Sequence, residues 1–388
     1  MKICMISYSQ FEFDNRVHRY AKSLIGRGDT VDILCLGAKH QPRSEIVDGV
    51  KLYRLQARSY NEKGPLVYLV NLFRFFFLST WYCSKLYLKE RYDILHFHNI
   101  PDFGVFCTVI GRLSGARVIH DIHDLVPEFY QRKFNIGVTH PIYKILCWIE
   151  KMACRYAHQV ITVTDIWKDT IDRRSMSGKK CFVVLNAPDG DLFKPVSRPS
   201  GNNNGYRLVY HGNLSEIFGV DLAVRAMPEI CKGVKNAELH IYGQGRDKYN
   251  LIEMTDRLMM TDKIFFHDPV SRTKVPDILK KADIGIDPKR NGILADEGLS
   301  SKCLEYLAMG LPAVVSKTKA ASYYYNDDMV LFFRPGSASD LSKQIVRLCR
   351  NKNLRKHLVH NAKYFNQKHQ WKKYESVYFN LLDGIKIH

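Results

Sequence analysis

The sequence predicts an α/β fold of two doubly wound, Rossmann-like domains that face each other across a cleft. Three observations lead to this prediction. The 388 residues are too many for one ordinary hydrophobic core. Short apolar runs alternate with amphipathic stretches along most of the chain, which is typical of a parallel sheet with helices on both faces. A segment rich in Pro, Ser, Asn and Gly, residues 195–205, interrupts the alternation once and predicts a linker.

The first predicted domain spans residues 1–195. Amphipathic stretches at residues 16–26 and 139–156 predict helices between short, apolar strands. The second predicted domain spans residues 206–370, with helices beginning near Val220, Asp247, Lys274, Ser301 and Ser337. The predicted strands are residues 3–7, 31–36, 94–98, 117–122, 159–163 and 182–185 in the first domain, and 207–211, 238–242, 263–266, 283–286, 313–316 and 329–333 in the second.

The composition is that of a globular protein, with 46% hydrophobic and 25% charged residues. The formal net charge of +19 is spread over both halves of the chain, and no basic tail or block indicates a nucleic-acid partner. A diffuse positive charge favours anionic small substrates and an anionic membrane surface. Ten scattered cysteines and an N-terminus unlike a signal peptide predict a reducing, cytoplasmic location.

Residues 66–82 form the most hydrophobic segment, LVYLVNLFRFFFLSTWY. It lies near the lower length limit for a membrane span and contains Asn71 and Arg74, so we do not expect it to cross a bilayer. Two readings remain. The segment is either an ordinary helix facing the core or an interfacial helix whose aromatic and basic side chains contact lipid headgroups on the inner membrane surface.

The segment from residue 296 to 316, DEGLSSKCLEYLAMGLPAVVS, predicts a loop, a short helix and a buried strand. Ser300 or Ser301 can cap the helix start, and Gly310 can provide the left-handed C-cap. Lys302 and Glu305 share one helix face, although such a pair is often only a solvated surface pair. A helix N-terminus that attracts anions, a cation and a carboxylate together suit a nucleotide diphosphate-sugar.

Two glycine-containing loops follow predicted strands of the second domain. Gly212 and Gly219 flank the first loop, and Gly243 and Gly245 lie in the second. Glycine allows backbone amides to approach a phosphate closely, but many α/β folds use it for turn geometry alone.

Histidines cluster at strand ends of the first domain. His96 and His98 lie on one side of a strand, whereas His120 and His123, three residues apart, are expected to point to opposite faces. A metal site is one interpretation of this cluster. The favoured interpretation is that His123 hydrogen-bonds a sugar substrate, and the alternative is a purely structural bond to Asp124.

The pair Glu297-x7-Glu305, the run LEYLAMGLPAVVS and the loop HGNLSE resemble the family-4 retaining glycosyltransferases of the GT-B fold. The resemblance covers nearly the whole chain and includes HFHN, HDIHDLVPE and LNAPDGDLF in the first domain. In that fold the first domain is the acceptor side and the second binds the nucleotide-sugar. The last helix, here about residues 371–388, packs back on the first domain.

The resemblance implies a role for each motif residue. Glu305 is expected to bind the ribose hydroxyls, Lys302 the diphosphate, and Glu297 and His123 to act at the donor sugar. Such enzymes need no metal ion and no cofactor. The other residues expected in the donor site are Gly212, Asn213, Leu304, Gly243 and Arg16.

The chain departs from the family pattern at the phosphate-binding loop. Many members have Arg and Lys where this sequence has Asn213 and Phe218. Lys302 is expected to compensate, together with Arg16 or Arg290.

The sequence therefore predicts an enzyme that moves a hexosyl unit from a nucleotide diphosphate-sugar to a saccharide acceptor, with retention of configuration. A lipid-linked acceptor, bacterial surface polysaccharide or lipopolysaccharide synthesis, and peripheral attachment to the cytoplasmic membrane are expected from the resemblance and from residues 66–82. Two alternatives remain: a nucleotide-sugar-binding or partner protein that has lost catalysis, and a metal hydrolase that uses His96, His98 and His123.

Overall fold

The computed structural model describes residues 1–57, 65–176, 181–196, 205–290, 292 and 296–384. The chain forms two compact units, Met1–Leu185 with Glu375–His388, and Asn186–Tyr374. The division falls at residue 185, whereas the sequence predicted a boundary at 195, and most of the predicted linker lies outside the described residues. The last helix, α15 (Trp371–Asp383), begins in the second unit and continues in the first. The prediction of two doubly wound α/β domains is confirmed.

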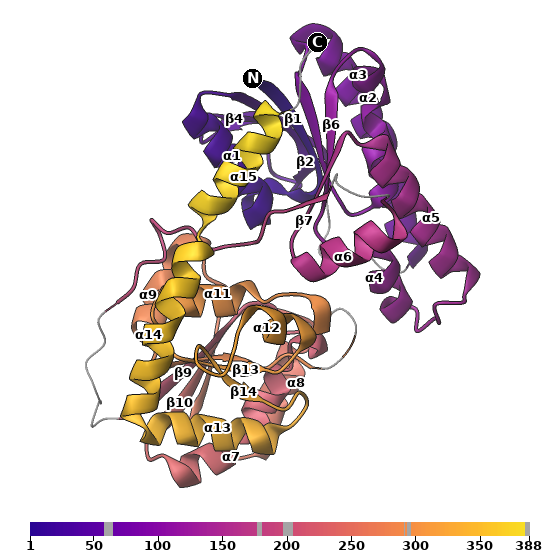
Figure 1. Ribbon diagram of the computed structural model, residues 1–388. Helices are drawn as coiled ribbons and strands as arrows, with labels where there is room; N and C mark the ends of the chain where they lie inside the picture. The colour runs from indigo at the N-terminus through magenta and orange to yellow at the C-terminus, as the bar shows by residue number, and fades with distance from the viewer. Residues whose placement is uncertain (58–64, 177–180, 197–204, 291, 293–295, 385–388) are drawn as a thin grey trace. The chain divides into compact units, whose positions relative to one another are not determined.

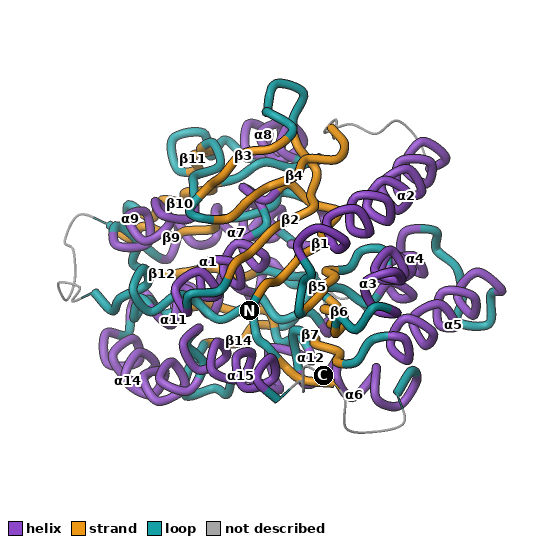
Figure 2. Tube along the Cα trace, turned by 90° about the horizontal axis from the view of Figure 1, so that it is seen from above, coloured by secondary structure: helices purple, strands orange, loops and turns teal. Residues whose placement is uncertain are grey.

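The first unit is built on an eight-stranded sheet in the order β3-β4-β2-β1-β5-β6-β7-β8. Figure 2 shows β4, β2, β1, β5 and β6 following one another across this sheet. The strands are β1 (Lys2–Gln10), β2 (Thr30–Gly37), β3 (Ser44–Val47), β4 (Val50–Ala57), β5 (Ile94–His98), β6 (Arg117–Ile122), β7 (Gln159–Thr162) and β8 (Cys181–Val183). All neighbours pair in parallel except β3, which pairs antiparallel with β4. The sequence prediction missed β3 and β4.

Helices lie on both sides of this sheet, with α1 and α15 on one side and α2 and α3 on the other (Figure 1). Asp14 caps α1 by accepting hydrogen bonds from the backbone N–H groups of Arg16 and Val17. The helical elements are α1 (Asn15–Arg27), α2 (Pro65–Glu90), α3 (Val109–Leu113), α4 (Val126–Lys133), α5 (Pro141–Tyr156) and α6 (Asp165–Arg174), with 3-10 turns η1 (Phe11–Phe13) and η2 (Asp102–Thr108).

The second unit is built on a six-stranded, fully parallel sheet in the order β11-β10-β9-β12-β13-β14. Its strands are β9 (Tyr206–His211), β10 (Ala237–Tyr242), β11 (Ile264–His267), β12 (Ile284–Asp287), β13 (Ala313–Ser316) and β14 (Leu331–Phe333). The helical elements are α7 (Val220–Gly233), α8 (Lys248–Arg257), α9 (Val275–Lys280), α11 (Ser301–Ala308), α12 (Lys319–Tyr324), α13 (Ala338–Arg350) and α14 (Lys352–Lys368), with η3 (Glu216–Phe218) and η4 (Arg272–Lys274).

The carboxyl ends of β9, β10, β12 and β13 position the loops that carry the candidate site. In parallel α/β sheets these ends share one edge, and ligands bind there. Strands β12 and β13, whose side chains are all buried, fix the backbone on either side of α11.

Candidate active site

Helix α11 anchors the site in the second unit. Its apolar face, Cys303, Leu304, Leu307 and Ala308, is buried as the sequence predicted. Gly310 adopts the left-handed conformation, with φ of +62°, and ends the helix. The N-cap prediction is only partly right, because Ser300 occupies the N-cap position but its side chain makes no capping hydrogen bond. The N–H groups of the first turn therefore have no side-chain cap from Ser300.

Lys302 is a buried cation beside the glycine loop. The residue is only 8% exposed. Its Nζ lies 4.8 Å from the centre of the Phe218 ring and 5.4 Å from the centre of the Tyr210 ring. A Cβ built on Gly212 would lie 3.5 Å from the same Nζ. Within the described part of the chain the ammonium forms no ion pair. Phe218, which replaces the usual lysine, thus supports Lys302 through a cation–π contact.

The loop after β9 is fixed by close backbone packing against the loop after β10. The N–H of Gly212 donates to the carbonyl of Tyr242 at 2.9 Å, and that of Leu214 donates to Gln244 at 3.0 Å. Gly212 has a φ of +129°, and a Cβ on Gly243 would lie 1.9 Å from the carbonyl oxygen of Gly212. Both glycines are therefore required by geometry whether or not a ligand binds.

Asn213 is exposed at the tip of this loop. Its carbonyl oxygen accepts a hydrogen bond of 2.7 Å from the Tyr210 hydroxyl, which holds the loop backbone from below. The loop therefore presents an exposed amide side chain at the position where the family pattern described above has an arginine.

Glu305 lies on the same helix as Lys302 and close to the end of β9. One carboxylate oxygen is 3.3 Å from Nε2 of His211, and its side chain is 16% exposed. Burial, with a further contribution from the charge of Lys302, lowers the pKa of His211 to about 3. His211 is therefore neutral near pH 7, and its Nε2 lies close to Glu305 without a hydrogen-bond partner among the described residues.

Arg272, in η4, is a residue that the sequence prediction missed. Burial lowers the pKa of its guanidinium, while the charges of Glu305 and Asp189 act in the opposite direction. The site thus gathers a second cation near Glu305. No motif marked Arg272, because the contact depends on the fold between β11 and α9.

Because His211 is neutral in the folded protein, the free energy of unfolding should depend on pH in a way that can be tested. The pKa of His211 is lower in the folded than in the unfolded protein, so the unfolded state binds the extra proton below about pH 6.5, and folding stability falls as the pH is lowered. Between pH 7 and pH 5 this residue is expected to contribute a loss of about 2 kcal/mol. The variant His211→Gln should therefore lose about 2 kcal/mol less than the wild type in urea unfolding at the two pH values. Equal losses would contradict the assignment, since the two proteins differ only at residue 211.

Glu297 lies in the loop before α11 and is held by α12. Its carboxylate forms an ion pair of 2.7 Å with Nζ of Lys319, and its side chain is 18% exposed. The neighbouring Asp296 accepts a hydrogen bond of 2.8 Å from the backbone N–H of Lys319. Lys319 was absent from the sequence prediction, because a lysine after Thr318 carries no recognisable signal. The contact fixes Glu297 at the edge of the second unit.

Leu304 does not present its side chain to a ligand. It is 2% exposed and belongs to the packed face of α11, so its side chain is part of the core, which corrects a side-chain role in donor binding. Arg290 forms an ion pair with Asp221, but its side chain is 31% exposed. It lines a pocket with Leu214, Ser215 and Glu216. Its role as a replacement for the missing cations therefore stays a prediction.

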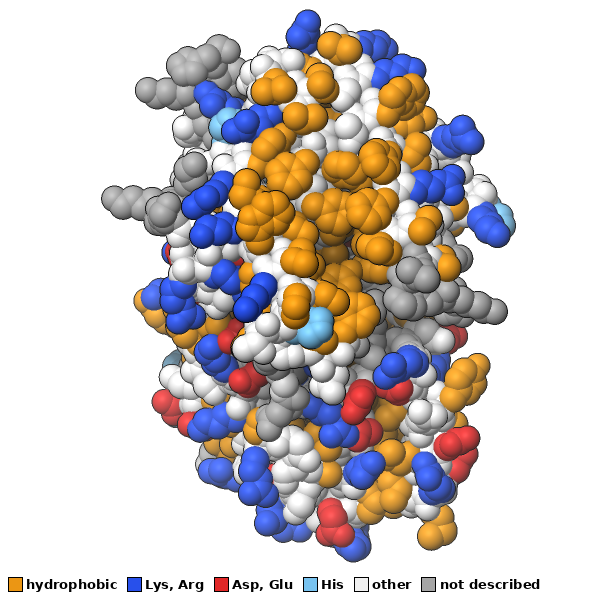
Figure 3. Space-filling view, turned by 90° about the vertical axis from the view of Figure 1, so that its right-hand side faces the viewer, with side chains coloured by type: hydrophobic (Ala, Val, Ile, Leu, Met, Phe, Trp, Pro, Cys, Tyr) orange, Lys and Arg blue, Asp and Glu red, His pale blue; other side chains and the backbone are white. Residues whose placement is uncertain are grey.

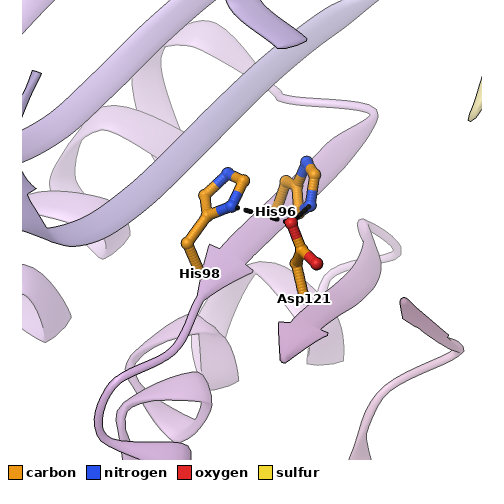
Figure 4. Close-up of side chains that lie close together, drawn as sticks. All are labelled: His96, His98 and Asp121. Carbon is orange, nitrogen blue, oxygen red and sulfur yellow. Dashed lines mark hydrogen bonds and ion pairs between the residues drawn. The ribbon is translucent and has the colours of Figure 1, made fainter. Parts of the chain in front are cut away.

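In the first unit, a polar cluster occupies the buried ends of β5 and β6. Figure 4 shows that His96 and His98 come from one strand and Asp121 from its neighbour. Nδ1 of His98 lies 3.2 Å from Oδ2 of Asp121, and Nδ1 of His96 lies 3.0 Å from the hydroxyl of Tyr378 on α15. All three of the drawn residues are fully buried.

Arg16 is the counter-ion of this cluster. Its Nε and Nη2 donate to the two oxygens of Asp121, each at 2.8 Å, and its Nη1 donates to the carbonyl of Val184 at 2.6 Å. Burial opposes ionisation of Asp121, but the charge of Arg16 and hydrogen bonds from His123 and His98 hold its pKa well below the usual range. Arg16 is only 4% exposed, so it orients Asp121 and is not the predicted phosphate ligand.

His123 is the exposed end of the same network. Its Nε2 lies 3.1 Å from Oδ2 of Asp121 and 3.1 Å from Nδ1 of His98, and its side chain is 18% exposed. Its backbone N–H donates to Oδ1 of Asn99 at 2.7 Å. His120 points elsewhere, with Nε2 3.3 Å from Asp102, as the strand alternation predicted.

The ligand atoms of His96, His98 and Asp121 all lie within 4.8 Å of one another, which is compatible with a metal site by distance alone. However, both Asp121 oxygens accept hydrogen bonds from the Arg16 guanidinium. A metal ion there would have to displace a buried, bidentate cation or lie beside its charge. The chemistry of the donor set therefore fits a hydrogen-bonded network around an ion pair better than a metal centre.

Two family models match the chain, one after the other. Residues 14–191 match Glycosyltransferase Family 4, and residues 196–365 match Glycosyl transferases group 1. A Methanocaldococcus jannaschii protein described as an uncharacterized glycosyltransferase is 27% identical over 352 residues, 87% of this chain and 85% of that protein. One component of the phosphatidylinositol N-acetylglucosaminyltransferase of Arabidopsis thaliana is 25% identical over 252 residues. That match spans 64% of this chain but only 52% of the plant protein.

Solved structures share the fold over almost the whole chain. A sucrose-phosphate synthase from Thermosynechococcus elongatus superposes with a TM-score of 0.81 at 16% identity and covers 99% of both chains. The Anabaena protein HepE, in complex with UDP and glucose, gives a TM-score of 0.75 at 14% identity and covers 99% of this chain and 100% of its own. Together with the two family models, the double Rossmann-like architecture leads to one conclusion: this chain belongs to the family-4, group 1 glycosyltransferases of the GT-B fold.

Proposed function

We propose that the chain transfers a hexosyl unit from a nucleotide diphosphate-sugar to a saccharide acceptor, with retention of configuration and without a metal ion. The observation that carries this proposal is the geometry around Lys302. An ammonium group is held between two aromatic rings, beside a backbone loop and one helical turn from Glu305. A cation, backbone N–H groups and a carboxylate in one place match the diphosphate and the ribose of such a donor.

In this proposal the donor diphosphate lies beside the loop that begins at Gly212. Lys302 and the N-terminus of α11 balance its charge, which grows on the leaving group as the glycosidic bond breaks. Glu305 accepts hydrogen bonds from the ribose hydroxyls, and Nε2 of neutral His211 lies 3.3 Å from the carboxylate. These protein groups supply the stabilisation that a metal ion would otherwise provide.

Glu297 is proposed to act at the donor sugar, with its carboxylate held by Lys319. The variant Glu297→Gln should lower kcat about 100-fold or more and change the dissociation constant of the nucleoside diphosphate less than threefold, because it removes a charge used mainly in the transition state. Single-turnover assays and calorimetry separate the two quantities. A large loss of nucleotide affinity with unchanged turnover would instead place Glu297 on the nucleotide side.

His123 is proposed to hydrogen-bond the transferred sugar from the first unit. Its orientation is set by Asp121 and His98, while its own ring remains partly exposed. This arrangement leaves a polar ring at the surface of an otherwise buried network, which suits a positioning contact to substrate.

The competing proposal is a protein that binds nucleotide-sugars without turning them over. It is motivated by Asn213 and by Phe218, which stand where many family members carry cations. A panel of nucleotide diphosphate-sugars tested for release of the nucleoside diphosphate distinguishes the two. A pure binder would show a shift in melting temperature with every tight ligand but no turnover, with or without saccharide acceptors.

We further propose that the acceptor is lipid-linked, as in assembly of a bacterial surface polysaccharide or lipopolysaccharide, and that the enzyme works on the cytoplasmic face of the membrane. Helix α2 has both a buried side and an exposed aromatic side, so it agrees with both interpretations of residues 66–82, as a core-facing helix and as an interfacial helix. Leu72, Phe75 and Cys83 are buried, whereas Phe77 and Trp81 are 65% and 56% exposed on another face. Within the described residues, none of the helices is both long and apolar enough to cross a bilayer.

If the protein attaches peripherally to the membrane, its exposed tryptophans should contribute to membrane binding. Trp81 on α2 and Trp148 on α5 are 56% and 62% exposed. The double variant Trp81→Ser/Trp148→Ser should reduce binding to vesicles that contain phosphatidylglycerol about tenfold or more in a flotation assay, because two interfacial aromatic anchors are lost. A wild-type protein that stays in solution with such vesicles would refute the membrane proposal.

A further inference from the structure

The first unit contains an apolar cavity of about 380 Å³, between α2, η2, α4 and α5. The volume lies within the range of small-molecule sites, roughly 300–1,000 Å³. Its walls are almost entirely hydrocarbon and aromatic, with Leu69 and Phe73 from α2, Phe103 from η2, Tyr130 from α4 and Leu146 from α5. The Phe73 and Phe103 rings stack with centroids 5.3 Å apart, which makes this wall continuous. Such a lining suits a hydrocarbon chain and offers little to a polar ligand.

The polar groups in the wall are the carboxylate of Asp102 and the hydroxyls of Tyr68 and Tyr130. Asp102 is 1% exposed and accepts a hydrogen bond of 2.8 Å from Nδ2 of Asn99. Its other neighbour is His120, 3.3 Å away. Oδ1 of Asp102 makes both of these contacts, whereas the buried Oδ2 has no hydrogen-bond partner among the described residues.

The cavity opens in an exposed apolar surface with a basic surround. Figure 3 shows hydrophobic side chains gathered on this face, with Lys and Arg around them. Apolar side chains that are 44–65% exposed come from both α2 and α5: Val67, Leu69, Val70, Phe73, Phe77, Trp81, Ile142, Ile145 and Trp148. An exposed apolar surface of this kind marks an interaction site.

The charges on these two helices identify the kind of partner. The exposed ionic side chains Arg74, Lys85, Lys89, Lys144 and Arg155 are all cationic. The acidic residues of the two helices are Glu90, which is half-buried at the end of α2 beside Lys2, and Glu150, which is fully buried against Arg174. Apolar anchors within a cationic surround are complementary to an anionic lipid.

A short hydrogen-bonded path connects the cavity wall to His123. Asn99 donates to Asp102 in the wall and, through Oδ1, accepts the backbone N–H of His123 at 2.7 Å. Asn99 also donates to the carbonyl of Asp124 at 2.9 Å, two residues before the cavity residue Val126. The loop that presents His123 therefore leads directly into the cavity wall.

We propose that this cavity binds the hydrocarbon chain of an anionic lipid acceptor, so that the head of the same molecule lies toward His123. The proposal rests on the function proposed above and adds the binding site for the lipid part of the substrate. The connection to the His123 loop favours the acceptor over a bulk membrane lipid, because a lipid unrelated to the reaction has no reason to be bound beside that loop.

The test uses cis-parinaric acid, an anionic fatty acid whose fluorescence rises in apolar surroundings, with the full-length protein and no membrane present. Wild-type protein should bind the probe, and farnesyl phosphate should displace it. Leu146→Trp places a larger ring in the cavity and should raise the dissociation constant of the probe at least tenfold. Ile142→Asp, at a position that is 45% exposed and tolerant of a polar residue, should do the same if Leu146→Trp does not fold, because it adds a negative charge that repels the anionic probe.

The matched control is Leu113→Trp, which adds the same ring on α3 at a site that is 75% exposed and outside the cavity. It should bind the probe as the wild type does.

Equal affinities of the probe for the wild type and for a folded cavity variant would overturn the proposal. Displacement of the probe by phosphatidylglycerol but not by farnesyl phosphate would also overturn it. Binding of nucleoside diphosphates should be unchanged in both cavity variants. If the wild-type protein turned over no nucleotide-sugar donor, that result would count against the proposed function but would not affect the result for the cavity.

Discussion

Replacing Glu305 with alanine is expected to raise the dissociation constant for a nucleoside diphosphate about 30- to 150-fold. The reason is that a carboxylate hydrogen-bonded to ribose hydroxyls contributes about 2–3 kcal/mol, and each 1.4 kcal/mol corresponds to a factor of ten. The loss should be larger for the ribonucleotide than for its 2′-deoxy form, because the latter already lacks one hydroxyl. Isothermal titration calorimetry measures both directly.

The matched control for this variant is Glu229→Ala. Glu229 is a solvent-exposed glutamate of the same unit, paired with Lys232 on the surface of α7, with its side chain 60% exposed. Its removal should change nucleotide affinity less than twofold, because surface ion pairs contribute little. A Glu305→Ala protein that binds the diphosphate as tightly as the control would remove Glu305 from the donor site.

Replacing Asp121 with asparagine is expected to lower the free energy of unfolding by about 3–5 kcal/mol, because the buried Arg16 guanidinium then lacks its counter-ion. Both residues are almost fully buried, and the bond between them is bidentate. Urea unfolding at pH 7 gives the loss. Since the pKa of Asp121 is lowered in the folded state, its stabilising contribution is present above about pH 4 and disappears as the pH falls toward the folded pKa.

Asp172→Asn provides the comparison for this experiment. Asp172 pairs with Lys168 one turn away on α6, and both side chains are partly exposed. Its loss should cost at most about 1 kcal/mol. The double variant Arg16→Met/Asp121→Asn should recover part of the stability, because no unpaired charge then remains buried. If Asp121→Asn were no more harmful than Asp172→Asn, the buried ion pair would not organise the first unit.

Much of the fold follows from local patterns in the sequence. The bounds of β5, β6 and β13 were predicted to the residue. Strands buried on both faces read as apolar runs, as AVVS of β13 does, although β5 and β6 also contain buried His and Asp residues. The edge strand β3 and its neighbour β4 were missed. β4 alternates buried and half-exposed side chains and includes Lys51 and Arg54, so it lacks such a run, although its period of two was available as a signal.

The candidate site was predictable where a motif is local and not where partners come together through folding. Lys302 and Glu305 lie on one short helix, so their spacing alone placed them together. Arg16 and Asp121 are 105 residues apart, and no local pattern shows that a charged residue at the start of α1 is buried. Lys319 is likewise 22 residues from Glu297. Such pairs are set by the tertiary structure.

The central claim is that Lys302 and Glu305 build a site for a nucleotide diphosphate-sugar. Calorimetry of the wild-type protein tests it most directly, by comparing the affinities for UDP, GDP and ADP with those for the corresponding nucleosides. We predict that one diphosphate binds in the micromolar range and its nucleoside at least 100-fold more weakly. Removal of the charge by Lys302→Met should erase most of that difference, because the ammonium acts on the phosphates and not on the base. Equal affinities for nucleoside and diphosphate, or a preference that survives Lys302→Met, would contradict the account.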